Sequence, residues 1–156
     1  MTRTAKKRGG RSSKRKCGAR SPAHRAAVDY AQKLCRLRAG YKCFVCGSTT
    51  RQTHAHHLIG RSVVAYSADQ RNLVCLCSRC HNGDSKLSAH LAPWAFEAWM
   101  KEHARDRWVW WDNRRWRPES AKGRDWCEIR DRLKATYERE LKEYGEPAGE
   151  EANNAT

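Results

Sequence analysis

Apolar residues recur at helical spacing in one segment near each end of the chain. The first covers about residues 22–39, where Ser21-Pro22 has the form of an N-cap followed by a first-turn proline and Gly40 supplies a stop. The second covers about 124–144, and one face of it carries Trp126, Ile129, Leu133, Tyr137, Leu141 and Tyr144. Because three or four residues separate most of the apolar positions, both segments are predicted to be helices with one buried face.

Between these helices the pattern changes to short apolar pieces separated by turn residues. Strands are predicted for residues 52–58 and 73–76, with a polar, glycine-containing loop between them. A short helix is predicted after Cys80 through about Leu87, and Pro93 opens a further helix. One side of that further helix carries Phe96, Trp99, Met100 and His103. Helices around two short strands indicate an α+β fold.

The next segment mixes tryptophan with arginine, in the order Trp108, Trp110, Trp111, Arg114, Arg115, Trp116 and Arg117. Two interpretations are open. Aromatic rings beside guanidinium groups stack on nucleic-acid bases, whereas large aromatic side chains also anchor the edge of a core. The core interpretation is preferred here.

The charge balance indicates what kind of partner the chain binds. Its 156 residues include 32 Lys and Arg against 17 Asp and Glu, which gives a formal net charge of +15. This excess favours a polyanionic partner, most simply nucleic acid, with an anionic membrane surface as the lesser alternative. No apolar run reaches the roughly 18–20 residues that cross a bilayer, and the first residues lack the apolar core of a signal peptide. We therefore expect no membrane partner and no secretion.

Composition divides the chain into five segments. Residues 1–21 hold nine Lys or Arg and no acid, which predicts a flexible basic arm or, as the alternative, a solubility tail without a specific role. The helix within 22–40 is expected to pack on the region 41–92, which carries the candidate chemistry. Residues 93–145 are expected to be helical and tryptophan-rich, and 146–156 to form a disordered acidic tail.

Four of the eight cysteines form two C-x-x-C pairs, Cys43 with Cys46 and Cys77 with Cys80. Without a secretion signal, two such pairs predict a structural zinc ion held by four thiolates. The other four cysteines have no partner at a recognisable spacing and are expected to be dispensable for the zinc; they are Cys17, Cys35, Cys75 and Cys127.

The interval between the two cysteine pairs carries further chemistry. Thirty residues separate Cys46 from Cys77, more than the roughly 15–20 of a plain zinc ribbon. The interval contains the doublet His56-His57 and, 15 positions after its second member, Asn72. His81 follows Asn72 by 9 positions and stands directly after the second cysteine pair.

This order of Cys-x-x-Cys, His-His, Asn and Cys-x-x-Cys-His resembles the HNH endonuclease family, including phage-type members, over about residues 41–90. The resemblance implies a small ββα-metal (His-Me finger) core, here flanked by helices. It implies that His57 is the general base, that His56 and His81 hold a divalent ion, and that Asn72 fixes the loop between the strands. The ion would be Mg²⁺ or another divalent ion (Mn²⁺, Ni²⁺ or Zn²⁺), and the location cytoplasmic, in a bacterial or phage-infected cell.

Two positions depart from the family pattern or stand outside it. Many members have another metal ligand four residues after the last histidine, and here that residue is Ser85. Two protein ligands plus water are therefore expected, with weak and exchangeable metal binding. His54 is interpreted as a strand-face histidine without a role, with an auxiliary ligand as the alternative.

The function that the resemblance implies is metal-dependent hydrolysis of DNA phosphodiester bonds by an endonuclease. The alternatives are a non-catalytic zinc-binding nucleic-acid-binding protein, which gives no reason for the histidines and Asn72, and a degenerate HNH protein that binds DNA without turnover. Phosphate contacts are predicted for four basic residues of the motif region, with a merely solvated rim as the alternative; they are Arg61, Arg71, Arg79 and Lys86. The sequence does not indicate an oligomeric state.

Overall fold

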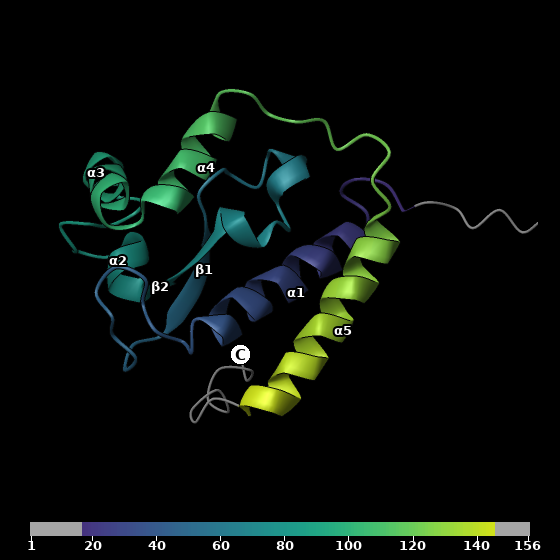
Figure 1. Cartoon of the computed structure of the whole chain (residues 1–156), viewed down its shortest axis with the longest axis horizontal. Helices are drawn as coiled ribbons and strands as arrows, with labels where there is room; N and C mark the ends of the chain where they lie inside the picture. Colours follow the sequence, from purple (N-terminus) through teal and green to yellow (C-terminus); the bar gives the residue numbers. More distant parts are fainter. Residues whose placement is uncertain (1–16, 146–156) are drawn as a thin grey trace, which may run out of the picture.

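The computed structural model describes residues 17–145, in which helices surround a two-stranded sheet (Figure 1). Along the chain its elements are α1 (Pro22–Arg38), β1 (Thr53–His57), the 3-10 turns η1 (Val64–Tyr66) and η2 (Gln70–Asn72), β2 (Leu73–Cys77), α2 (Ser78–Asn82), α3 (Pro93–His103), α4 (Arg105–Arg115) and α5 (Trp126–Tyr144). The fold is α+β, as predicted. Among the described residues no helix is long and apolar enough to cross a membrane. Most of the predicted basic arm (1–16) and all of the predicted acidic tail (146–156) lie outside the described residues.

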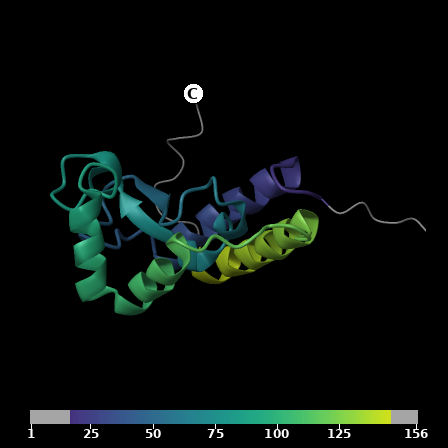
Figure 2. The ribbon, with the colours of Figure 1, turned by 90° about the horizontal axis from the view of Figure 1, so that it is seen from above.

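Helix α1 is the central layer of the fold. The buried face of α1 consists mostly of small side chains and contains Ala23, Ala27, Ala31 and Leu34. These side chains form one core with Leu73 and Cys75 of β2 and with Trp126 and Leu133 of α5. Figures 1 and 2 show α1 and α5 side by side, with the sheet on the other side of α1. The order of layers is therefore α5, α1, sheet, and then the remaining helices.

Cross-links tie the matching ends of α1 and α5, so the two helices run parallel. Just before α1, Cys17 forms a disulfide with Cys127 in the first turn of α5, with their Cα atoms 5.4 Å apart. The backbone N–H of Trp126 also donates to the carbonyl of Cys17 at 3.1 Å. At the other end, the guanidinium of Arg38 donates two hydrogen bonds of 2.8 and 2.6 Å to the carboxylate of Glu140.

The disulfide corrects the expectation that Cys17 and Cys127 have no partner. They stand 110 residues apart, so no local spacing marks them, and they meet only because α1 packs along α5. Residues 17–21, expected to belong to the flexible arm, are thereby held against α5. Cys35 and Cys75 are buried and free.

The strands β1 and β2 pair antiparallel, with His56 opposite Val74 and His57 opposite Leu73. Each strand begins and ends within one residue of its predicted bounds. Strand β2 is buried along its whole length, because its alternate residues face two different cores. This explains the continuous apolar run that marked the strand in the sequence.

The second core lies on the side of the sheet opposite α1 and settles the role of most of the tryptophans in 108–117. Trp108 and Trp111 of α4 pack against it. Trp110 is buried in a neighbouring cluster, where its ring lies edge-on to Tyr66 with centroids 5.8 Å apart. The core interpretation is confirmed for these three, whereas Trp116 remains 76% exposed.

Helix α2 is shorter and earlier than predicted. The sequence analysis placed it after Cys80 through Leu87, but it spans Ser78–Asn82 and contains Cys80. Gly83 ends it, since its N–H bonds back to the carbonyls of the first turn and a Cβ there would lie 2.8 Å from the Cα of Arg79. Turns, not helix, therefore lead from α2 to α3.

Removing the disulfide with Cys127→Ser is expected to lower the free energy of unfolding by about 2–4 kcal/mol, because the cross-link restricts the unfolded chain. Urea unfolding followed by circular dichroism measures this difference under non-oxidising, non-reducing conditions. As a control, a phosphine reductant cleaves the disulfide of the wild-type protein. The two proteins should then have the same free energy of unfolding. Equal stability of the two proteins without reductant would contradict this expectation.

Candidate active site

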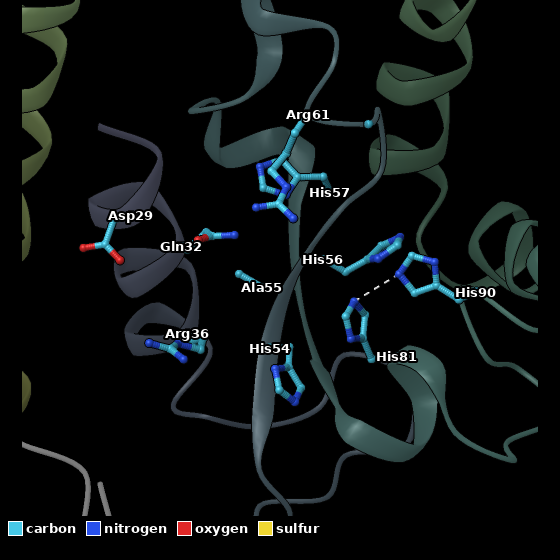
Figure 3. A pocket seen from close by; sticks show the side chains of 11 residues that line it. Asp29, Gln32, Arg36, His54, Ala55, His56, His57, Arg61, His81 and His90 are labelled. Atoms are coloured by element: carbon cyan, nitrogen blue, oxygen red, sulfur yellow. Dashed lines mark hydrogen bonds between the residues drawn. The ribbon is translucent and has the colours of Figure 1, made fainter. Parts of the chain in front are cut away.

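A cavity of about 490 Å³ lies beside β1, with walls from α1, α2 and the loops that follow β1 and α2 (Figure 3). Five of the seven histidines of the chain line it, namely His54, His56, His57, His81 and His90. Asp29, Arg36 and Arg61 add charged groups to its walls. A cavity that gathers so many titratable, metal-ligating side chains is the candidate site.

Three imidazole rings converge at one place in this cavity. His56 comes from β1, His81 from α2 and His90 from the turn before α3, and Figure 3 shows the three rings gathered together. Their centroids lie 4.8 to 5.3 Å apart, and one nitrogen of each ring lies within 4.8 Å of the others. The Nε2 atoms of His81 and His90 are 3.2 Å apart. Neutral imidazoles at this spacing can hold one divalent transition-metal ion.

His90 is the functional candidate that the sequence analysis missed. It follows His81 by nine positions rather than four, so the family pattern did not indicate it. Ser85, at the expected position, instead has its Oγ 3.7 Å from the Sγ of Cys80. Two backbone hydrogen bonds fold the chain back onto α2, from Ala89 N–H to the Cys80 carbonyl at 2.9 Å and from His90 N–H to the His81 carbonyl at 3.1 Å. This return of the chain brings the third ring into place.

Burial keeps two of these rings, those of His56 and His81, in the neutral form that binds metals. Burial and the neighbouring rings of His81 and His90 lower the pKa of His56 to about 3. Burial and the rings of His90 and His54 lower the pKa of His81 to about 4. His54 itself stacks on His81 with centroids 5.3 Å apart, so it packs against the histidine cluster. Near neutral pH, His56 and His81 therefore offer lone pairs rather than positive charges.

His57 lies next to His56 in β1 but has a different set of neighbours, because adjacent side chains of a strand point to opposite faces. Figure 3 shows it near Arg61, away from the three converging rings. Its Nε2 lies 2.9 Å from the carbonyl oxygen of Ser67. A carbonyl only accepts, so Nε2 carries the proton and Nδ1 keeps its lone pair. Burial lowers the pKa of His57, the hydrogen bond to Ser67 opposes this, and Arg61 adds to the lowering.

Asn72 is fully buried and bonds to both sides of the loop between the strands. Its Oδ1 accepts the N–H of Ile59 at 2.7 Å, and its Nδ2 donates to the carbonyls of Ile59 at 2.9 Å and Tyr66 at 3.0 Å. Its own carbonyl accepts the N–H of Leu58 at 2.9 Å. The side chain therefore fixes the segment that directly follows His57.

The four cysteines of the C-x-x-C pairs meet beside α2, with their Sγ atoms within 4.8 Å of one another. The first pair lies in a turn that Gly47 closes at a φ of +70°, with its N–H bonded to the Cys43 carbonyl. Burial raises the pKa of Cys43, but hydrogen bonds from backbone groups outweigh it and lower the value to about 7. Four thiols this close together could hold a metal ion such as zinc. Because Cys80 directly precedes His81, this cluster also positions α2 for the histidine cluster.

The four residues predicted to contact phosphate are all exposed: Arg61, Arg71, Arg79 and Lys86. Of these, Arg61 lines the cavity. Arg71 and Arg79 each form a salt bridge of 2.9 Å with a nearby aspartate. Arg36 of α1 also lines the cavity, which no sequence motif indicated.

A family model described as HNH endonuclease matches residues 43–86, which include both cysteine pairs, β1, β2 and α2. A curated protein named Anaredoxin, from Nostoc sp. (strain PCC 7120), is 36% identical over 64 residues, covering 38% of this chain and 83% of that protein. No solved structure matches significantly. A two-stranded sheet followed by a short helix, with clustered cysteines and histidines, defines a ββα-metal type of fold. The chain belongs to the HNH endonuclease family.

The purified protein is expected to hold one tightly bound zinc ion through Cys43, Cys46, Cys77 and Cys80, with Zn–S distances of ~2.3 Å. The joint change Cys77→Ser and Cys80→Ser should remove it, whereas Cys35→Ser, outside the cluster, should not. Elemental analysis after gel filtration measures the zinc, and X-ray absorption identifies its ligands. Zinc retained by the double variant, or a mainly nitrogen and oxygen shell, would contradict the assignment.

Proposed function

We propose that this protein is a metal-dependent DNA endonuclease of the HNH type, which hydrolyses phosphodiester bonds. The observation that carries the proposal is the cavity itself, which is lined by the three converging imidazoles of His56, His81 and His90 and also by His57 with its Nδ1 lone pair. Membership of the family supports the reaction class. The net charge of +15 supports a polyanionic substrate.

In hydrolysis a water molecule loses a proton as it attacks phosphorus, and negative charge develops on the oxygen that leaves. His57 is the general base of this proposal, with Nδ1 taking the proton. The Ser67 carbonyl holds Nε2–H at the same time, so the positively charged ring that forms has an acceptor already in place. A divalent ion on His56, His81 and His90 would act as a Lewis acid for the leaving oxygen.

The ligand atoms that the cavity offers indicate which divalent ion it binds most tightly. Imidazole nitrogens suit Zn²⁺ and Ni²⁺, whereas Mg²⁺ and Mn²⁺ prefer carboxylates and water. Among the described residues Asp29 is the acid that lines the cavity, and its carboxylate is 2.9 Å from the ammonium of Lys33. We therefore propose that Zn²⁺ or Ni²⁺ binds this site more tightly, and that Mg²⁺ or Mn²⁺ needs higher concentrations.

Arg61 is the phosphate contact nearest to the reaction in this proposal, because it lines the cavity together with His57. Arg71, Arg79 and Lys86 are proposed as contacts further along the DNA, and residues 1–21 as a basic segment that adds affinity. Asn72 acts through geometry, by holding the loop that follows His57.

The His57→Ala variant is expected to lose about 10²–10⁴-fold of the cleavage rate, because it lacks the proton acceptor. Its zinc content, folding and DNA affinity should stay normal. Cleavage of supercoiled plasmid and of branched DNA, with Mg²⁺, Mn²⁺, Ni²⁺ or Zn²⁺, measures the rate. His103→Ala is the matched control, since His103 is an exposed histidine of α3 outside the cavity.

If His57→Ala cleaves like the wild type, the base lies elsewhere. If the wild type binds DNA but cleaves neither DNA substrate nor RNA with any of these ions, the protein is a non-catalytic nucleic-acid-binding member of the family.

His90→Ala is expected to raise the divalent-ion concentration for half-maximal cleavage at least ~10-fold, as His81→Ala should, because even groups behind the ligands change metal affinity by ~10–100-fold. Isothermal titration with Ni²⁺ measures the affinity directly, on protein whose cysteine cluster is loaded with zinc. Ser85→Ala is the control at the position where many family members have a ligand. If the Ni²⁺ affinity of His90→Ala is unchanged, His90 is not a ligand and the site has two protein ligands.

A further inference from the structure

A buried hydrogen-bond chain connects α1, which lies outside the matched family segment, to His57. It starts at His24 in the first turn of α1, which is 8% exposed and packs edge-on against Trp126 with ring centroids 4.3 Å apart. The backbone N–H of Arg20 donates to Nδ1 of His24 at 3.2 Å. Nδ1 therefore carries no proton, so in the neutral ring Nε2 carries it. Burial and the nearby Arg25 and Arg20 lower the pKa of His24, which keeps the ring neutral.

The next member of the chain is Ser67, a fully buried residue at the end of η1. Its Oγ lies 2.8 Å from Nε2 of His24 and 2.8 Å from the Val64 carbonyl. Since Nε2 of His24 is a donor, Oγ accepts from it and donates its own proton to Val64. Each proton in this series of hydrogen bonds has one assigned acceptor, so the hydroxyl group of Ser67 has a single orientation.

The same serine supplies the acceptor for His57. Its carbonyl oxygen takes the Nε2–H of His57 at 2.9 Å, while its N–H bonds to the Val64 carbonyl at 3.2 Å. The side chain and the backbone of one residue thus serve opposite ends of the chain of bonds. We propose that Ser67 and His24 are positioning residues for the general base: they hold the carbonyl that fixes the tautomer and ring orientation of His57. This inference rests on the proposed nuclease function.

The loop explains why such support is needed. Between β1 and β2 the backbone runs through residues 58–72 with two short 3-10 turns, and Asn72 holds it at Ile59 and Tyr66. Ser67 lies just beyond the last of these attachments, and the bond from His24 attaches it to α1. A catalytic group displaced by about 1 Å can lose roughly 10²-fold in rate. A loosened Ser67 carbonyl would free His57 to rotate or to change tautomer.

The test compares Ser67→Ala, which keeps the carbonyl but loses Oγ, and His24→Phe, which keeps a buried ring but loses Nε2. Both should reduce kcat for plasmid cleavage roughly tenfold or more, with KM, zinc content and Ni²⁺ affinity unchanged. Ser67→Thr and His24→Gln each keep a hydrogen-bonding group and should recover most of the rate. Val28→Ala is the matched control, because it removes buried volume from α1 without touching the chain of bonds.

A second measurement does not depend on cleavage. Two-bond ¹H–¹⁵N correlation spectra of histidine-labelled protein report which ring nitrogen carries the proton. In the wild type and in Val28→Ala, His57 should show a single Nε2–H tautomer; in Ser67→Ala and His24→Phe it should show a mixture. If His57 keeps its tautomer in both variants, and kcat falls no more than in Val28→Ala, then His24 and Ser67 only stabilise the fold and the inference is wrong. If the wild type does not cleave, the proposed function fails, while these spectra still decide whether Ser67 holds His57.

Discussion

The convergence of four cysteine sulfur atoms beside α2 is the constraint on which the cavity depends. Two strands of five residues each make a sheet that is marginal by itself in water. A metal ion on the cysteines would close the chain around this sheet and fix α2, because Cys77 ends β2 and Cys80 lies inside the helix. His81 follows directly, and backbone bonds to residues 80 and 81 set the position of His90. The cysteine cluster therefore determines the positions of His81 and His90 in the histidine cluster.

The other half of the site is held from the opposite side. His56 and His57 are neighbours in β1, yet the pleat of a strand sends their side chains to different partners. His56 meets the rings that the cysteine cluster positions, whereas His57 bonds to a loop that Asn72 and α1 hold. Helix α1 is itself fixed to α5 by the disulfide at one end and by Arg38 with Glu140 at the other. Elements outside the matched family segment thus support the candidate base.

Short sequence patterns predicted the features that depend on residues close together in the sequence. Helical spacing placed α1 and α5, the buried apolar run placed β2, and the two C-x-x-C pairs indicated the cysteine cluster that the structure contains. What the sequence did not reveal depends on contacts between distant segments. His90 reaches the site because the chain folds back on α2, Cys17 meets Cys127 because two helices pack, and Ser67 meets His24 across the core. The bounds of α2 were wrong because the backbone becomes extended at Gly83, directly after Asn82, so the helix ends there.

In the proposed nuclease, the charges around the cavity would link metal binding to DNA binding. The three converging histidines contribute no negative charge, Asp29 is paired with Lys33, and Arg36 and Arg61 add positive charge. A divalent ion held there would keep its double charge, because neutral imidazoles do not neutralise it. A bound phosphate would supply the negative oxygen ligands that the protein lacks. Because coupling between two binding sites is reciprocal, the ion would then strengthen DNA binding by the same factor by which DNA strengthens binding of the ion. In the proposed function, such a site would be complete only when both the phosphate and the metal ion are bound.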